Sequence, residues 1–523
     1  MPILNLNSIV AEGVRLDTLV LKWFKECTPK VLVVTDNLNY VANDDFGLTT
    51  FVDTLRASTI HGMSPIVVTA TFNPNPMAAL SYNAATQHIT NFKFADATHG
   101  VKKSRYDVVF MLSINGEFGS KLTDEGGALT AMIDFMQAGG GVFATGDHAD
   151  LGAAMGMDLP RVRNMRKWRA ADTPSAGGTD RLTTNLAGAG DVYEFADQSD
   201  EFPQRLYANF RTEAGGVGNP HPLLHVPASA RAIEVFPDHP HEGECVVPSN
   251  LATKMPDGTT DEWPVQTGGG PRVAPEAVAL TMSHGDSFPG KAAVIPRSFI
   301  AICAYDGQRA NVGRVATDAT WHHFVNVNLV GDLPALPPGR QGLTGRNMDD
   351  VKQYYKNLAS WLMPKNVRYC LRFPIIVKEL VRYPLFEELE PIPLDKLAGV
   401  QFRDIGALVE DSLARRLPRF VVDAIRDDAL EEALGLDAKT KLDAFGRDFG
   451  KVSAHDVGLA ALGALTMGTA EMVSELKGRE DIDGERAFSG VASKATKLGV
   501  RRYLEESRTE LRKMDALIGS VSV

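Results

Sequence analysis

The strongest constraint on the fold is a repeated alternation of short apolar runs with amphipathic segments between residues 30 and 145. Each run is rich in β-branched residues and stops at a polar loop, as buried strands do. Helical spacing of apolar residues follows over 46–56 and over 123–137, and three consecutive glycines end the second helix. Such alternation predicts an α/β fold, a mostly parallel sheet with helices on both faces. The runs are Lys30–Thr35 (KVLVVT), Pro65–Ala70, Tyr106–Leu112 and Val142–Thr145.

The rest of the chain divides into three parts. Residues 150–230 are rich in Gly, Pro and Asn, and we interpret them as a long insertion that shapes the active site. Four further strands and a helix over 349–362 would close the α/β domain at about residue 365. Long amphipathic patterns then predict a helical C-terminal domain over 366–523. The four strands are expected over 232–236, 278–282, 298–305 and 313–317.

Composition and charge restrict the class of protein. The chain has 523 residues, of which 44% are apolar and 23% charged, and this balance is typical of a globular protein with more than one domain. The net charge of -11 argues against a nucleic-acid partner, which would require clustered cations. One basic stretch, from Arg161 to Arg169, is expected to be a solvated surface face.

No targeting or membrane-spanning segment is recognisable. The first residues lack a basic region followed by an apolar one, and no later segment has the roughly 20 apolar residues that cross a bilayer. The four cysteines, Cys27, Cys245, Cys303 and Cys370, stand alone without CxxC spacing. We therefore expect no membrane partner, a reducing compartment and a cytoplasmic location.

The residues with chemical potential follow the predicted strands. Ligands of open α/β sheets bind beyond the carboxyl ends of the strands, so these positions form the candidate site. Four predicted strand ends carry histidine together with a carboxylate. The residues there are Asp147, His148 and Asp150; Asp238, His239, His241 and Glu242; His284 and Asp286; and Asp318, His322 and His323.

Imidazole and carboxylate groups together are the usual ligands of zinc-like divalent ions, which activate water at neutral pH. We therefore hypothesise a divalent metal, with His148, His239, His241, His284, Asp286 and His323 as candidate ligands. The competing interpretation is that each histidine is simply a hydrogen-bonded loop or core residue. The sequence has no HExxH motif that would decide between the two.

Other candidates lie on the same edge of the predicted sheet. Asp36 and Asn37 follow the first strand and are candidate substrate-binding residues, although Asn and Asp also serve as turn and cap residues. Glu117, after the third strand, is a candidate substrate contact or general base, and an exposed loop carboxylate is the alternative. Trp321 would supply an apolar or sugar-stacking wall, and simple packing in the core is the alternative.

Two stretches resemble a known family. The run YDVVFMLSINGEFGSKLTDEGGALTAMIDFMQAGGGVFATGDH and the later VGRVATDATWHHF resemble the trehalose-utilisation-protein-like branch of the class I glutamine amidotransferase-like fold. The likeness covers residues 30–150 and 310–330. It implies a histidine at the turn where amidotransferases carry cysteine, here His148, and a second one at His322 or His323. It also implies sugar-related substrates.

The chain departs from amidotransferases at the residue that matters most. Their chemistry needs a nucleophilic cysteine at the turn, and this turn has none, so glutaminase activity is disfavoured. Cys303 lies in the apolar run FIAICAY, where a buried, unreactive thiol is expected.

Two functional hypotheses follow. In the first, Asp147, His148, His322 and His323 hold a divalent ion or polarise a substrate oxygen, Asp318 orients an imidazole, and water attacks. This enzyme would be a metal-assisted hydrolase or lyase acting on a small polar, carbohydrate-related substrate. In the second, the α/β domain is a non-catalytic ligand-binding module, and the helical domain mediates homo-oligomerisation or partner contact.

Overall fold

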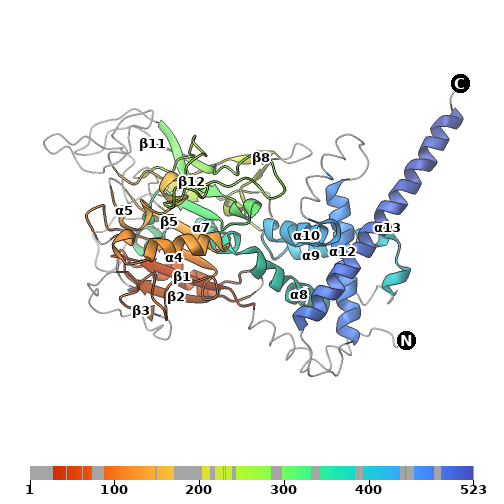
Figure 1. The fold of residues 1–523 in the computed structure, drawn as a ribbon, viewed down its shortest axis with the longest axis horizontal. Coiled ribbons are helices and arrows are strands. Elements are labelled where there is room, and N and C mark those ends of the chain that lie inside the picture. The colour runs from red at the N-terminus through yellow and green to blue at the C-terminus, as the bar shows by residue number, and fades with distance from the viewer. Residues whose placement is uncertain are drawn as a thin grey trace. The chain divides into compact units, whose positions relative to one another are not determined.

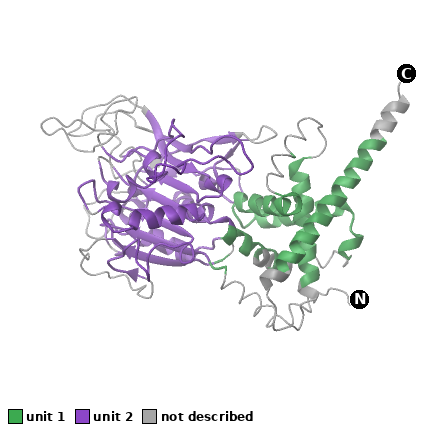
Figure 2. Ribbon diagram, in the orientation of Figure 1, with its two compact units in different colours: residues 1–28, 61–63, 366–523 green, residues 29–60, 64–365 purple. Residues whose placement is uncertain are grey.

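A computed structural model provides the fold. It describes residues 27–42, 44–61, 63–72, 88–119, 121–147, 150–169, 203–212, 218–227, 229, 231–237, 243–283, 297–330, 342–382, 393–435, 442, 453–475 and 484–521. The described residues form two compact units, which are coloured separately in Figure 2. The α/β unit comprises residues 29–60 and 64–365, and the helical unit contains the residues from 366 onward together with 1–28 and 61–63.

Within the described residues, one nine-stranded sheet organises the α/β unit (Figure 1). Its order is β3-β2-β1-β4-β5-β13-β12-β11-β7, and the six strands from β3 to β13 are parallel. The predicted strand at Lys30–Thr35 is confirmed at both ends as β1. The other parallel strands are β2 (Ile66–Thr71), β3 (His88–Ile89), β4 (Val108–Leu112), β5 (Gly141–Thr145) and β13 (Val315–Asp318).

Helices cover both faces of this sheet, as predicted. On one face Val109, Met111 and Val142 pack in a common core with Phe135 of α4 (Ala128–Gln137). On the other face Phe110 lies 5.3 Å, ring to ring, from Phe51 of α3 (Thr49–Ala57). The ring of Phe51 lies in turn 4.9 Å from that of Tyr355 of α7 (Gly345–Leu362). Alternate residues of one strand therefore enter two separate apolar layers, which fixes the register of the strand.

The far side of the sheet differs from a purely parallel arrangement. β12 (Arg297–Tyr305) runs antiparallel to β13, and β11 (Glu276–Ser283) runs antiparallel to β12. The edge strand is β7 (Tyr207–Ala208). The predicted strand over 232–236 is reduced to β10 (Val235–Phe236), which pairs with β6 (Gln204–Arg205) in a separate two-stranded sheet. A further small sheet pairs β8 (Phe210–Thr212) with β9 (Gly218–Pro220).

The helical unit is built from α9 (Gly399–Ala414), α10 (Arg419–Leu434), α12 (Ala454–Glu475) and α13 (Gly484–Val521), preceded by α8 (Lys365–Arg382). α12 packs against both α9 and α13. α9 and α10 are separate helices, because Pro418, which lies between them, cannot donate the hydrogen bond that a continuous helix requires. No helix in the described ranges is both long and apolar enough to cross a membrane.

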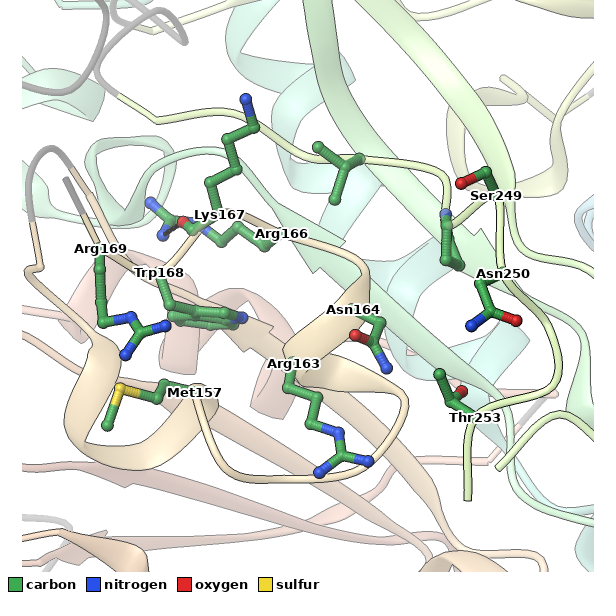
Figure 3. A pocket seen from close by; sticks show the side chains of 12 residues that line it. Met157, Arg163, Asn164, Arg166, Lys167, Trp168, Arg169, Ser249, Asn250 and Thr253 are labelled. Carbon is green, nitrogen blue, oxygen red and sulfur yellow. Dashed lines mark hydrogen bonds between the residues drawn. The ribbon is translucent and has the colours of Figure 1, made fainter. Parts of the chain in front are cut away.

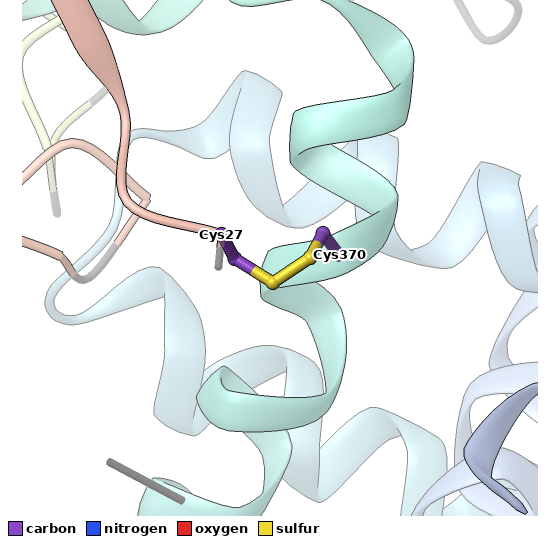
Figure 4. The surroundings of a disulfide bond; sticks show 2 residues. All are labelled: Cys27 and Cys370. Atoms are coloured by element: carbon purple, nitrogen blue, oxygen red, sulfur yellow. A yellow bond between two sulfur atoms is a disulfide. The ribbon is translucent and has the colours of Figure 1, made fainter. Parts of the chain in front are cut away.

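The cysteines do not all stand alone. Cys27 and Cys370, the latter on α8, form a disulfide with 5.6 Å between their Cα atoms (Figure 4). The expectation of unpaired cysteines was wrong because the two partners are 343 residues apart, a separation that no spacing rule detects. A structural disulfide is rare in a reducing compartment, so this pair does not support that prediction.

The other two cysteines behave as expected of core thiols. Cys245 and Cys303 are unpaired and fully buried. Burial raises the pKa of Cys245 to about 12, and it raises the pKa of Cys303 well above its usual value. Both thiols are therefore protonated and unreactive at neutral pH.

Candidate functional site

The carboxyl ends of four neighbouring strands lie level with one another. Thr35 of β1 pairs with Leu112 of β4, Leu112 pairs with Thr145 of β5, and Thr145 pairs with Asp318 of β13. The chain builds β1, β2 and β3 toward one side and then β4, β5 and β13 toward the other. The order of the strands thus reverses between β1 and β4, and ligands of open α/β sheets bind at such a reversal.

Asp36 occupies the reversal point itself. Its buried carboxylate accepts hydrogen bonds from the hydroxyl of Ser113 and from the main-chain N–H of Ile114, the latter at 2.7 Å. Burial raises the pKa of Asp36 to about 6, although these hydrogen bonds oppose the shift. Because its oxygens are occupied by the chain, Asp36 joins the loops after β1 and β4 rather than facing a substrate.

Asn37 is the exposed neighbour of Asp36 at the same point. Its side-chain amide donates a hydrogen bond to the side-chain oxygen of Asn115, in the loop after β4. Two amide side chains thus lie at the reversal, where they are accessible to a polar ligand.

The turn after β5 is tightly packed. A Cβ atom on Gly146 would lie 2.4 Å from the main-chain oxygen of Leu151, and one on Gly152 would lie 2.4 Å from Gly146 itself. Gly152 also has a φ of 96°, which favours glycine. This turn places Asp147, which directly follows Gly146, against the segment after β13.

Asp147 and His322 face each other at this turn. Oδ1 of Asp147 accepts a hydrogen bond of 2.7 Å from the hydroxyl of Thr320, and Oδ2 lies 3.5 Å from Nε2 of His322. Nδ1 of His322 lies 2.9 Å from the side-chain oxygen of Asn328, and the ring stacks on Trp321 with 4.1 Å between centroids. The side chain of His322 is 9% exposed, whereas that of Asp147 is fully buried. The imidazole is therefore held on three sides and reaches solvent on one.

Asp318 and His323 form a second pair beside the first. Nδ1 of His323 lies 2.8 Å from Oδ1 of Asp318, and the hydroxyl of Tyr354 donates a 2.8 Å hydrogen bond to Oδ2. The ring of Phe236, at the end of β10, contacts His323 with 4.5 Å between centroids. Both members of the pair are fully buried. Burial, followed by the charge of Asp318, raises the pKa of Tyr354 well above its usual value, so its hydroxyl remains a donor.

Arg166 bridges the main chain of the Asp147–His322 pair and that of the Asp318–His323 pair. Its guanidinium donates to the main-chain oxygens of Asp147 at 2.6 Å, Ala319 at 2.7 Å and Asp318 at 3.2 Å. Arg166 is 2% exposed and Arg161 is fully buried. The expectation of a solvated basic face was therefore wrong for these two residues, because carbonyl and carboxylate oxygens of distant segments hold them inside the protein.

Trp321 and Glu117, two of the predicted substrate contacts, have surroundings that suit a substrate poorly. Trp321 is only 3% exposed, so its ring supports His322 and leaves little surface for a sugar to stack on. Glu117 keeps 33% of its side chain exposed and lies 3.9 Å from Arg169, and it is therefore not desolvated as a general base would need to be. Its main-chain N–H donates a 2.8 Å hydrogen bond to Asp150.

The remaining predicted ligands, His148, His239, His241, His284 and Asp286, lie outside the described residues. Within the described part of the chain, no three His, Cys, Asp or Glu side chains gather as a metal site. Nδ1 of His323 is taken by Asp318, and its buried Nε2 has no hydrogen-bond partner among the described residues, so His323 keeps one nitrogen that could bind a ligand. Asp147 and His322 are a second pair of potential donors.

Several residues that build the site were not foreseen. Ser113, Thr320, Asn328, Tyr354 and Arg166 supply most of its hydrogen bonds. Only Thr320 had a local signal, since it lies between Asp318 and His322 and caps the short helix that carries both histidines.

Comparison with known proteins identifies no relative, since no family model, no curated protein and no solved structure matches this chain.

Proposed function

We propose that the α/β unit is a hydrolase or lyase that acts on a small polar substrate at Asp147 and His322. The observation that carries the proposal is the 3.5 Å approach of Nε2 of His322 to Oδ2 of Asp147 at the carboxyl edge of the sheet. Both side chains are fixed by further residues, Thr320 and Asn328, and the imidazole has access to solvent. Fixed orientation of a base next to a carboxylate is the usual requirement for proton transfer in catalysis.

In this proposal each atom of the pair has a role that agrees with its hydrogen bonds. Nδ1 of His322 would donate its proton to the amide oxygen of Asn328, and Nε2 would then act as the base. Nε2 accepts a proton from water or from the substrate, and the nearby Asp147 stabilises the imidazolium that forms. Thr320 holds the carboxylate in place through Oδ1 while Oδ2 faces the ring.

In the metal-assisted form of this proposal, Oδ2 of Asp147 and Nε2 of His322 would hold a divalent cation in place of the transferred proton. Two donors of a tetrahedral zinc ion lie about 3.3 Å apart, given bond lengths near 2.0 to 2.1 Å. The separation of 3.5 Å between Oδ2 of Asp147 and Nε2 of His322 is close to that value. Asp147 and His322 would hold the ion, which would supply Lewis-acid polarisation of a substrate oxygen.

The resemblance to the trehalose-utilisation branch of the class I glutamine amidotransferase-like fold belongs to the same proposal. Its support is the mostly parallel sheet and the position of Asp147 on the turn after β5. Carbohydrate-related esters, glycosides and sugar acids are therefore the first substrates to test.

The experiment combines an activity screen with metal analysis. The full chain, purified without a metal column, is assayed on panels of glycosides, esters and sugar acids, and bound metal is counted by mass spectrometry. We expect turnover to fall at least about 100-fold in His322→Ala and in Asp147→Asn, a range typical of lost acid–base catalysis. His455→Ala is the matched control, because its Nε2 also lies 3.5 Å from a carboxylate, that of Glu410 in the helical unit. Equal turnover in His322→Ala and wild type would refute the proposal.

The binding-module hypothesis has its own supporting observation. Val400 and Leu408 of α9 are 46% and 47% exposed, which leaves apolar surface on the helical unit for a partner or a second copy. Association that depends on a sugar ligand, measured by analytical ultracentrifugation without any turnover, would favour this alternative.

A further inference from the structure

A recess in the α/β unit is lined in part by Arg166, which contacts the strand-end residues Asp147 and Asp318. It has a volume of about 470 Å³, within the range of small-molecule sites. Figure 3 shows that its wall consists of two facing segments, residues 157–169 and residues 246–253. The first segment supplies the cations, and the second supplies Ser249, Asn250 and Thr253.

The lining of this recess is strongly biased in charge. Four of its twelve residues are cationic, namely Arg163, Arg166, Lys167 and Arg169, and none is acidic. The carboxylates that pair with three of these cations lie outside the lining. Nitrogen–oxygen distances are 2.8 Å for Arg163 and Glu262, 3.4 Å for Lys167 and Glu244, and 3.9 Å for Arg169 and Glu117. The last pair is too long for a hydrogen bond, and the side chain of Arg169 is 43% exposed at the wall of the recess.

Arg166 adds a buried positive charge to the wall. Its hydrogen bonds within the described chain go to four main-chain oxygens, those of Asp147, Lys167, Asp318 and Ala319. Trp168 covers the guanidinium, whose central carbon lies 4.8 Å from the ring centroid. These carbonyl dipoles and the nearby charges of Asp147 and Asp318 stabilise the buried cation, and an anion in the adjacent recess would also be attracted by it.

The polar neighbours can complete the recognition of an anion. Oδ1 of Asn250 already accepts a hydrogen bond of 2.9 Å from Ala252, which directs the amide N–H groups elsewhere. Asn250 and Ser249 are exposed on the wall of the recess. Met157 and Pro248 supply an apolar portion of the lining.

We propose that this recess binds the oxyanion group, phosphate or carboxylate, of a small organic ligand. Guanidinium and ammonium groups bind both kinds of oxyanion through charge-assisted hydrogen bonds. The volume exceeds what a single inorganic ion needs, so the ligand carries a further polar or apolar portion. This binding goes beyond the proposed function, because it requires neither turnover nor a metal.

The test measures binding of defined anions to the full chain. Pyrophosphate and citrate are titrated calorimetrically into protein that was dialysed into a chloride buffer of low ionic strength. We expect saturable binding of at least one of them, and a loss of affinity of at least about tenfold in the double variant Lys167→Met, Arg169→Gln. Preference for pyrophosphate or for citrate identifies the oxyanion as phosphate or carboxylate.

Two controls make the result decisive. The double variant Arg501→Gln, Lys513→Met removes the same charge from exposed positions on α13, and it should bind as wild type does. The single variant Arg169→Gln, at a position that is 43% exposed, repeats the test without risk to folding and should weaken binding about threefold or more. Wild type that binds neither anion, or control and pocket variants that weaken equally, would overturn the proposal. His322→Ala should retain anion binding, so failure of the proposed catalysis is distinguished from failure of this site.

Discussion

Two histidines that are neighbours in the chain have opposite environments. His323 lies 2.8 Å from Asp318, is fully buried, and shares that carboxylate with Tyr354. His322 lies 3.5 Å from Asp147 and keeps 9% of its side chain exposed. Identical residue types, one position apart, thus supply one imidazole that holds the core together and one that can meet a ligand. Exposure to solvent, rather than residue type, separates the two roles.

The largest expected loss of stability concerns the buried pair of Asp318 and His323. Asp318→Ala would leave His323 and Tyr354 without an acceptor in a dry interior, at a cost of about 3 to 5 kcal/mol in the free energy of unfolding. Urea denaturation followed by tryptophan fluorescence measures this loss. His322→Ala should cost less than half as much, because His322 touches solvent. Equal losses in the two variants would show that both histidines are structural.

Asp36, a third buried carboxylate on the same edge of the sheet, should make the stability of the protein depend on pH. The pKa of Asp36 is about 6 in the folded state because of burial, against a usual value of 3.8. The folded protein therefore binds the extra proton, and Asp36 makes stability fall as pH rises from about 4 to about 6. Two pKa units correspond to about 3 kcal/mol.

The Asp36→Asn variant isolates this contribution. Asparagine cannot ionise, so the unfolding free energy of wild type minus that of the variant should fall by about 2 kcal/mol between pH 4 and pH 7. Asp411→Asn, whose side chain is 67% exposed, serves as the control and should show no such trend. A constant difference between wild type and Asp36→Asn across this range would contradict the assignment.

The smallest expected loss of stability concerns Tyr354, whose hydroxyl donates a hydrogen bond to Asp318. Tyr354→Phe removes one hydrogen bond to a buried carboxylate and should cost about 2 kcal/mol. Tyr355→Phe removes a bond to the neutral main-chain oxygen of His323 and should cost about 1 kcal/mol. Thermal and urea unfolding measure both, and neither variant should change any turnover at His322 by more than its loss of stability explains. A larger loss of turnover in Tyr354→Phe would show that the Asp318–His323 pair takes part in the same function as His322.

The sequence predicted the layered architecture because periodicity reports which face of a strand or helix is buried. It located β1 at Lys30–Thr35 and the helical character of the last third of the chain. It could not reveal that β11 and β12 reverse direction, because an apolar strand has the same pattern in either direction.

The site shows a similar division. Candidate residues were recognisable by type and by their position after strands, and the structure brings Asp147 and His322 together. The partners that distinguish His322 from His323 were not recognisable. Asn328 and Tyr354 lie on helices, and nothing in the sequence pattern indicates that their side chains point toward the site. Arg166 was misjudged for the same reason, since the carbonyl groups that bury it come from more than 150 positions away in the sequence, at Asp318 and Ala319.

The bond between Cys27 and Cys370 has a topological consequence. It joins the chain just before β1 to the chain just after α7, and it therefore closes the whole α/β unit into a covalent ring. A single proteolytic nick inside that ring would leave both fragments attached to each other. An unfolded chain with the ring intact would also explore fewer conformations than an open one, which favours the folded state in proportion to the logarithm of the ring's length.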